Sequence, residues 1–206
     1  VFIRENIWED KKLTLETAKL KFEFMNHAQS LLHGDLHTGS IFIKEDSTKV
    51  IDPEFAFYGP AGYDVGNVIA NLTFAYVNAK FMIEDEEARK DQMEYLENTI
   101  IDMIDLFKDK FLKAWDEKVV ERVARYDGFK EYYLDTILRD TAAVTGLELC
   151  RRIIGLAPVK DITVIADQGN RARAEKICLS AGKTFIMERE KFTTGDDFVK
   201  VIRAYA

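Results

Sequence analysis

The chain has 206 residues, 47% of them hydrophobic and 32% charged, and its formal net charge at pH 7 is -7. A chain of this length and composition buries a core without help from disulfides, and its acidity disfavours a main role in binding nucleic acid. Its two cysteines, Cys150 and Cys178, form no CxxC pair, and no apolar run reaches the ~18 residues of a membrane span. These features predict a protein of the reducing cytoplasm that binds neither nucleic acid nor membrane.

The first predicted elements are a strand at the start of the chain and an amphipathic helix over residues 13–32. In "LTLETAKLKFEFMNHAQSLL" the apolar side chains recur at steps of three or four, which places them on one helical face. The residues of this predicted face are Leu15, Ala18, Phe22, Met25, Ala28 and Leu32. We therefore expect this face to be the one that packs against the protein.

A small hairpin and then a long helical region are predicted next. Residues 41–44 and 49–51 have the character of strands, joined by the turn-forming "EDST". After the loop "FAFYGPAGY", Asp64 is a good N-cap for a following helix. The remaining pattern predicts helices over residues 64–80, 85–113, 129–155, 170–188 and 196–204. The expected fold class is α+β, mainly helical, with one small β-hairpin.

Three carboxylates flank the predicted hairpin. Asp35 precedes its first strand and Asp52 follows its second, and these two ends lie side by side in an antiparallel pair. Glu54 is two residues beyond Asp52, so both side chains share a face, and Pro53 stiffens the backbone between them. We expect the three carboxylates to converge, with two of them placed to hold Mg²⁺ on a polyphosphate during phosphoryl transfer.

Two other interpretations of the same stretch stay open at this point. His33, Asp35 and His37 alternate in the pattern of transition-metal ligands, as in a metal-dependent hydrolase. Such a site would need further histidines downstream, yet the chain holds three in all, and the third is His27. The stretch could also be no more than a polar entry into a hairpin.

Two motifs together resemble the aminoglycoside phosphotransferase and choline kinase-like group, which is related to the protein kinases. They are "HGDLHTGSIFI" and "VIDPEFAFYGPAGYDVGNVIANL". Ser40 stands where most relatives have a metal-binding Asn, and "DPE" replaces their Asp-Phe-Gly. Both features resemble the branch that phosphorylates the 1-hydroxyl of S-methyl-5-thioribose in methionine salvage. The implied fold is the C-terminal lobe of a protein-kinase-like protein, and the implied activity is an ATP-dependent phosphotransferase with an alcohol acceptor.

The resemblance implies a role for each matching residue. Asp35 corresponds to the catalytic aspartate, Asp52 to the main Mg²⁺ ligand and Glu54 to a second metal ligand. His37 and Ser40 fall where relatives contact the phosphates and metal of ATP. His33 and Gly34 are expected to shape the catalytic loop, with His33 hydrogen-bonded to the backbone, and Asp64 corresponds to a residue that braces this loop.

Arg151 and Arg152 lie together in the apolar segment "LELCRRIIGLA". Adjacent helical positions point about 100° apart, so the two cannot share one narrow stripe. The resemblance implies that a twin arginine of this kind belongs to the active site, where it neutralises the transferring phosphoryl group. The alternative is an ordinary ion pair with carboxylates of the helix.

The domain organisation is the last expectation. The chain lacks an initiating Met, a glycine-rich phosphate loop and a strand lysine of kinase type. We therefore expect residues 1–206 to be a single C-terminal lobe that works with an N-terminal lobe of the same polypeptide on a small sugar substrate. The resemblance also admits a homodimer. Rival functions are an aminoglycoside, choline or homoserine phosphotransferase, and a non-catalytic kinase-like binding module.

Overall fold

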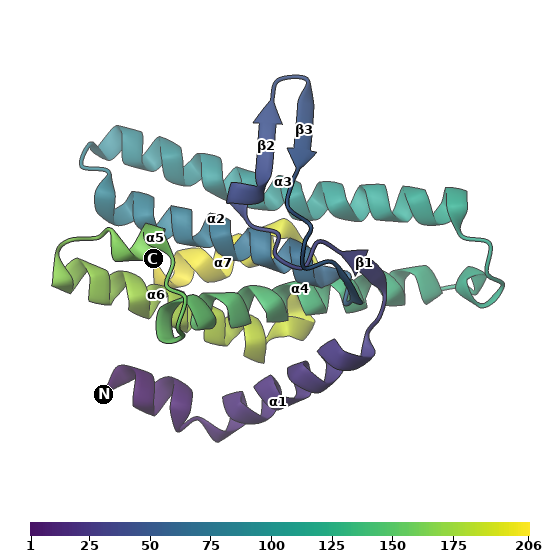
Figure 1. The fold of residues 1–206 in the computed structure, drawn as a ribbon, viewed down its shortest axis with the longest axis horizontal. Coiled ribbons are helices and arrows are strands. Elements are labelled where there is room, and N and C mark those ends of the chain that lie inside the picture. The colour runs from purple at the N-terminus through teal and green to yellow at the C-terminus, as the bar shows by residue number, and fades with distance from the viewer.

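The computed structural model describes all 206 residues as a mainly helical α+β fold. Its main helices are α1 (Lys11–Asn26), α2 (Gly62–Met82), α3 (Glu86–Lys118), α4 (Phe129–Ile154), α5 (Lys160–Thr163), α6 (Gln168–Met187) and α7 (Gly195–Tyr205). The strands β1 (Ser30–Leu32) and β4 (Phe57–Gly59) form one antiparallel pair, and β2 (Ile41–Lys44) and β3 (Ser47–Val50) form another. Figure 1 shows a body of long helices with the β2–β3 hairpin projecting from one side and α1 along the opposite side.

The core lies where α2, α3, α4, α6 and α7 meet. Phe74 of α2, Phe185 of α6 and Phe198 of α7 are fully buried within it. Gly66 lets α2 approach α4, because a Cβ at this position would lie 2.7 Å from the carbonyl oxygen of Thr141. This close packing fixes the position of α2 relative to α4, and both helices contribute residues to the candidate site.

Helix α1 departs from the sequence prediction in both length and orientation. It begins after the N-cap Asp10 and ends at Asn26, because residues 30–32 pair with β4 instead of continuing the helix. The side chains of Phe22 and Met25 are 71% and 74% exposed, whereas Leu13 and Leu20 are buried. The predicted apolar face was therefore wrong, since the buried one packs on a small cluster that includes Leu179 of α6. The strand expected at the start is also wrong, because residues 4–8 form a π-helical turn.

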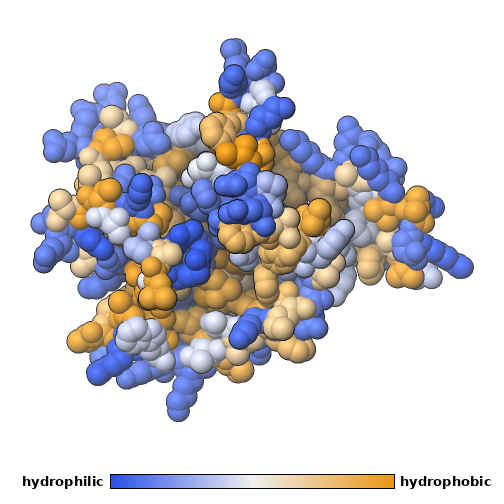
Figure 2. All heavy atoms as spheres, in the orientation of Figure 1, coloured by the Kyte–Doolittle hydropathy of each residue, from blue (hydrophilic) through white to orange (hydrophobic).

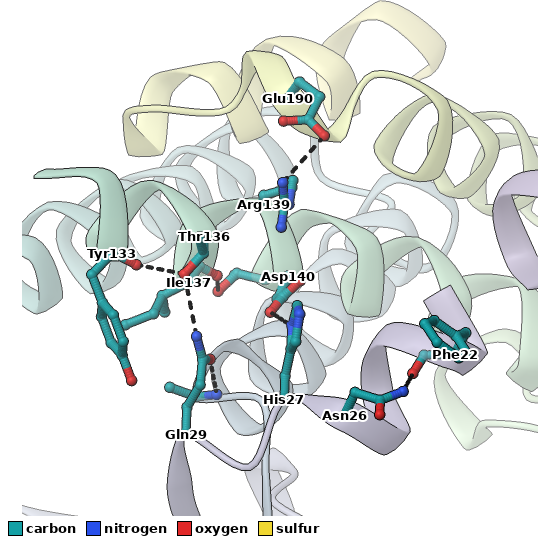
Figure 3. Close-up of polar contacts among 12 residues, drawn as sticks. Phe22, Asn26, His27, Gln29, Tyr133, Thr136, Ile137, Arg139, Asp140 and Glu190 are labelled. Carbon is teal, nitrogen blue, oxygen red and sulfur yellow. Dashed lines mark hydrogen bonds and ion pairs between the residues drawn. The ribbon is translucent and has the colours of Figure 1, made fainter. Parts of the chain in front are cut away.

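Side chains from the segment between α1 and β1 anchor it to α4, as Figure 3 shows. His27 Nδ1 lies 3.2 Å from Asp140 Oδ2, and Gln29 donates to Thr136 Oγ1 at 3.2 Å. Gln29 also accepts a hydrogen bond from the backbone N–H of Ala61 at 3.0 Å. Burial raises the pKa of Asp140, while the contact with His27 works in the opposite direction. These contacts hold the residues just before β1 in place, and therefore also the start of the loop that follows β1.

The predicted hairpin is confirmed with a shorter turn. Ile41 pairs with Val50 and Lys44 with Ser47, so only Glu45 and Asp46 form the connection. The apolar side chains of Phe42, Ile43, Val50 and Ile51 are exposed on this projecting hairpin. The five helices predicted after residue 64 are all present, with α3 extending five residues further than expected, to Lys118.

The burial expected for the two cysteines is confirmed by the structure. Cys150 and Cys178 are both buried, and burial raises the pKa of the Cys150 thiol to about 12. Neither thiol forms a disulfide. None of the helices is both long and apolar enough to cross a membrane.

Candidate active site

The loop from residue 33 to residue 40 joins β1 to β2 and is held by Asp64. The Asp64 carboxylate accepts hydrogen bonds from the backbone N–H groups of His33 at 2.6 Å and Gly34 at 3.1 Å. Gly34 has φ +87°, and a Cβ there would lie 2.3 Å from the carbonyl oxygen of Phe55, so the loop requires glycine. Asp64 is not the N-cap that the sequence predicted, because α2 begins at Gly62, but the bracing contact implied by the resemblance is present.

Removing the Asp64 carboxylate is expected to loosen this loop. Asp64→Ala leaves two backbone donors without their partner, at a cost of about 1–3 kcal/mol, so the amides of His33 and Gly34 should exchange about 5- to 150-fold faster. Hydrogen–deuterium exchange read residue by residue by NMR measures this. Asp85→Ala is the matched control, because Asp85 caps α3 through Ala88 N–H and lies outside the loop. Equal exchange at residues 33 and 34 in wild type and Asp64→Ala would contradict the bracing role.

The two histidines of the loop use their ring nitrogens internally. His33 Nδ1 accepts from the backbone N–H of Asp35, and its Nε2 donates to the carbonyl oxygen of Ile51 at 2.7 Å. His37 Nδ1 accepts from Gly39 N–H, and its Nε2 lies 3.3 Å from the hydroxyl of the buried Ser40. The backbone role expected for His33 is therefore observed. A transition-metal site would need these nitrogens free, so the arrangement disfavours the hydrolase alternative.

The carboxylates of Asp35, Asp52 and Glu54 make no hydrogen bond or ion pair within the chain, and Asp52 and Glu54 are exposed. Asp52 has φ +69°, an uncommon conformation for a residue other than glycine, although aspartate tolerates it better than most. The structure contains no group of three or more His, Cys, Asp and Glu side chains arranged to hold a metal ion. The expected convergence of three carboxylates is therefore not present as a preformed cluster.

The remaining donors still suit magnesium bound together with a polyphosphate. Mg²⁺ takes one or two protein carboxylates and completes its shell with phosphate oxygens and water, so it needs no all-protein cage. Asp52 and Glu54 are separated by one residue and have no competing partner in the chain. This donor set fits the ion that the sequence predicted.

Arg151 and Arg152 share one carboxylate. Arg151 donates from Nε and Nη2 to Glu148 at 2.7 and 2.9 Å, and Arg152 Nε donates to the same carboxylate at 2.6 Å. The hydrogen bonds to Glu148 are the main reason why the pKa of Arg151 is raised, and the charge of Asp35 adds to the effect. The ion-pair alternative is therefore observed.

A cavity of about 350 Å³ lies between α1 and α4 next to this cluster. In the orientation of Figure 1, Figure 2 shows apolar residues along the hollow between the two helices. Its wall includes Leu20, Phe24, Tyr63, Val144, Leu147, Glu148 and Arg151. Glu23 also lines it, and one of its carboxylate oxygens is buried without a partner. Sequence reasoning missed this cavity, because residues more than a hundred positions apart form it. Sequence reasoning also missed Glu148, although its spacing of three and four residues from the arginines predicts side-chain contact on a helix.

Comparison with known proteins supports the kinase-like fold class predicted from the motifs. Residues 4–99 match the phosphotransferase enzyme family. More specifically, the chain is 41% identical over 199 residues to a methylthioribose kinase of Bacillus pumilus, covering 97% of this chain and 48% of that protein. It is 42% identical over 194 residues to the Geobacillus kaustophilus methylthioribose kinase, covering 94% of this chain and 47% of the relative.

A plant relative extends the same comparison. Methylthioribose kinase 1 of Oryza sativa subsp. japonica is 37% identical over 195 residues, covering 89% of this chain and 45% of the relative. The chain is thus similar to the methylthioribose kinases over most of its length and to the phosphotransferase enzyme family over residues 4–99, and it spans about half the length of these kinases. The family resemblance and the fold class predicted from the motifs are confirmed.

Proposed function

We propose that the chain is the catalytic, acceptor-binding lobe of a kinase that transfers the γ-phosphoryl group of ATP to the 1-hydroxyl of S-methyl-5-thioribose, a step of methionine salvage. The observation that carries this proposal is the identity of 37–42% to three methylthioribose kinases over 89–97% of the chain. The braced loop that presents Asp35 with no internal partner supports it.

Each site residue has a role in this proposal. Asp35 orients the acceptor hydroxyl and takes its proton, while Asp52 and Glu54 hold Mg²⁺. When bound, the ion neutralises charge on the phosphates of ATP. His37 and Ser40 form the part of the loop assigned to the nucleotide, and their mutual contact keeps that turn in shape.

The arginines and the cavity complete the proposed site. Arg151, with Arg152 beside it, stabilises the charge of the transferring phosphoryl group. The α1–α4 cavity receives the acceptor: Arg151 lies in its wall, and the surface it exposes to a ligand is mostly apolar, which suits a methylthio group.

A second lobe is part of the proposal. The relatives extend well beyond the matched region, and exposed apolar residues such as Phe42 and Ile43 on the projecting hairpin offer a surface for another lobe to cover. We propose that residues 1–206 form one lobe, that a nucleotide-binding lobe belongs to the same polypeptide, and that the protein acts in the cytoplasm, where a homodimer is compatible with the proposal.

An acceptor panel tests the function. The full-length protein is assayed for ADP release with Mg²⁺-ATP and S-methyl-5-thioribose, an aminoglycoside, choline or homoserine. We expect turnover with the thiosugar to exceed that with the others by at least about 10²-fold, since a site fitted to its acceptor discriminates by several kcal/mol. Preference for another acceptor would replace the assignment. Binding of Mg²⁺-ATP in titration calorimetry without any product would support a non-catalytic module instead.

A further inference from the structure

The feature that the proposed function leaves unexplained is how two adjacent arginines act together. Arg151 and Arg152 occupy consecutive positions in the last turn of α4, so their side chains leave the helix about 100° apart. Both nevertheless end on Glu148, one turn earlier. We propose that Glu148 is the positioning residue of the site, which gathers both guanidinium groups and holds that of Arg151 at the wall of the α1–α4 cavity. This inference rests on the proposed function.

The contacts explain how one carboxylate serves two cations. Glu148 is three residues before Arg151 and four before Arg152, and both spacings bring side chains together on a helix. Arg151 binds both carboxylate oxygens of Glu148, and Arg152 Nε binds one of them at 2.6 Å. Arg152 also reaches the carbonyl oxygen of Ala157 at 3.4 Å. The two guanidinium groups are therefore each fixed in one direction.

Burial makes Glu148 the fixed member of the cluster. Its side chain is 5% exposed, whereas those of Arg151 and Arg152 are 53% and 23% exposed. A buried carboxylate is costly without a cation beside it, so the contacts with the two arginines stabilise Glu148 in this position. Arg151 is the more exposed partner and lines the cavity, which leaves its outer face free for a ligand.

Within the cluster of Glu148, Arg151 and Arg152, the charges do not cancel. Two guanidinium groups and one carboxylate carry a net charge of about +1, because arginine is always protonated in proteins. Glu148 thus removes most of the repulsion between the arginines while one positive charge remains for a phosphoryl group.

A second buried ion pair in the chain provides a matched control. Glu97 of α3 is also largely buried and accepts two hydrogen bonds from Arg203, one of them at 2.8 Å. It shares the chemistry of Glu148 but does not line the α1–α4 cavity. If Glu148 were only a structural ion-pair residue, the two glutamates should behave alike when substituted.

The test compares Glu148→Gln, Glu148→Asp and Glu97→Gln in the full-length enzyme. We expect Glu148→Gln to lower kcat about 10²-fold, the usual effect of a displacement of about 1 Å in a catalytic group. KM for ATP should change less than about 3-fold. Glu148→Asp, which keeps the charge, should recover at least 10-fold of this loss, and Glu97→Gln should keep wild-type kcat while it lowers Tm. Loss of kcat in Glu97→Gln to the same extent would overturn the proposal, as would wild-type kcat in Glu148→Gln.

An NMR measurement separates this inference from the proposed function. The Nε–H groups of Arg151 and Arg152 both donate to Glu148, so they should give slowly exchanging ¹H–¹⁵N signals in the wild type that disappear in Glu148→Gln. Persistence of both signals in that variant would overturn the positioning role whatever the activity. If the wild-type enzyme phosphorylates no acceptor, the proposed function and the catalytic part of this inference fail together, while the signals still report whether Glu148 positions the arginines.

Discussion

Asp35→Asn in the full-length protein is expected to lower kcat by about 10²–10⁴-fold, the contribution of a well-placed general base. An amide has nearly the same shape as the carboxylate but cannot accept the proton of the acceptor hydroxyl. The ADP-release assay with S-methyl-5-thioribose measures the loss. Calorimetric titration with Mg²⁺-ATP should give a Kd within about 3-fold of the wild type, because the proposed metal ligands are Asp52 and Glu54.

Asp35→Asn is expected to change the charge at this position without disturbing the fold. The Asp35 side chain has no hydrogen-bond partner in the chain, and the contact from its backbone N–H to His33 Nδ1 is unaffected by the change. The fold should therefore remain intact, with Tm within about 2 °C of the wild type. Asp46→Asn, in the exposed turn of the hairpin, removes the same charge outside the site and is expected to keep full activity. Undiminished turnover in Asp35→Asn would remove Asp35 from the mechanism.

The residues that sequence analysis placed correctly are those governed by local rules. The hairpin followed from two short β-like runs with a turn between them, and the long helices from their apolar period. Local rules failed for helix α1, because its apolar residues are compatible with two different buried faces. Tertiary packing determines that the face with Leu13 and Leu20 is the buried one. The end of α1 likewise depended on the pairing of β1 with β4, about 27 residues further along the chain.

The candidate site shows the same division. Asp64 had the spacing of an N-cap, yet its carboxylate serves a loop 30 residues earlier, which no local pattern reveals. The motifs identified Asp35, Asp52 and Glu54 by resemblance, while their mutual placement depends on how the chain bends at the left-handed Asp52. The arginine pair was predicted as active-site residues or as an ion pair; the structure shows the ion pair with Glu148, and the active-site role stays a prediction.

Asp52→Asn is the second substitution with a large expected effect. The loss of one carboxylate weakens the hold on Mg²⁺, and because the ion is worth several kcal/mol of transition-state stabilisation, kcat/KM for ATP should fall about 10²-fold or more. Glu54→Gln should cause a smaller loss, since Asp52 is the main proposed ligand. Titration of ADP release against Mg²⁺ is the measurement, and the concentration for half-maximal activity should rise in both variants. Calorimetric binding of Mg²⁺-ATP should weaken in parallel.

The choice of asparagine at position 52 follows from the backbone. Asp52 has φ +69°, which asparagine adopts almost as readily as aspartate, whereas alanine in this region is strained by about 1–2 kcal/mol. Asp52→Ala would therefore combine loss of a ligand with distortion of the chain, while Asp52→Asn changes the charge alone. Because the Asp52 side chain has no partner within the chain, Tm should stay within about 2 °C of the wild type. An unaltered Mg²⁺ requirement in this variant would show that the carboxylate at position 52 does not hold the ion.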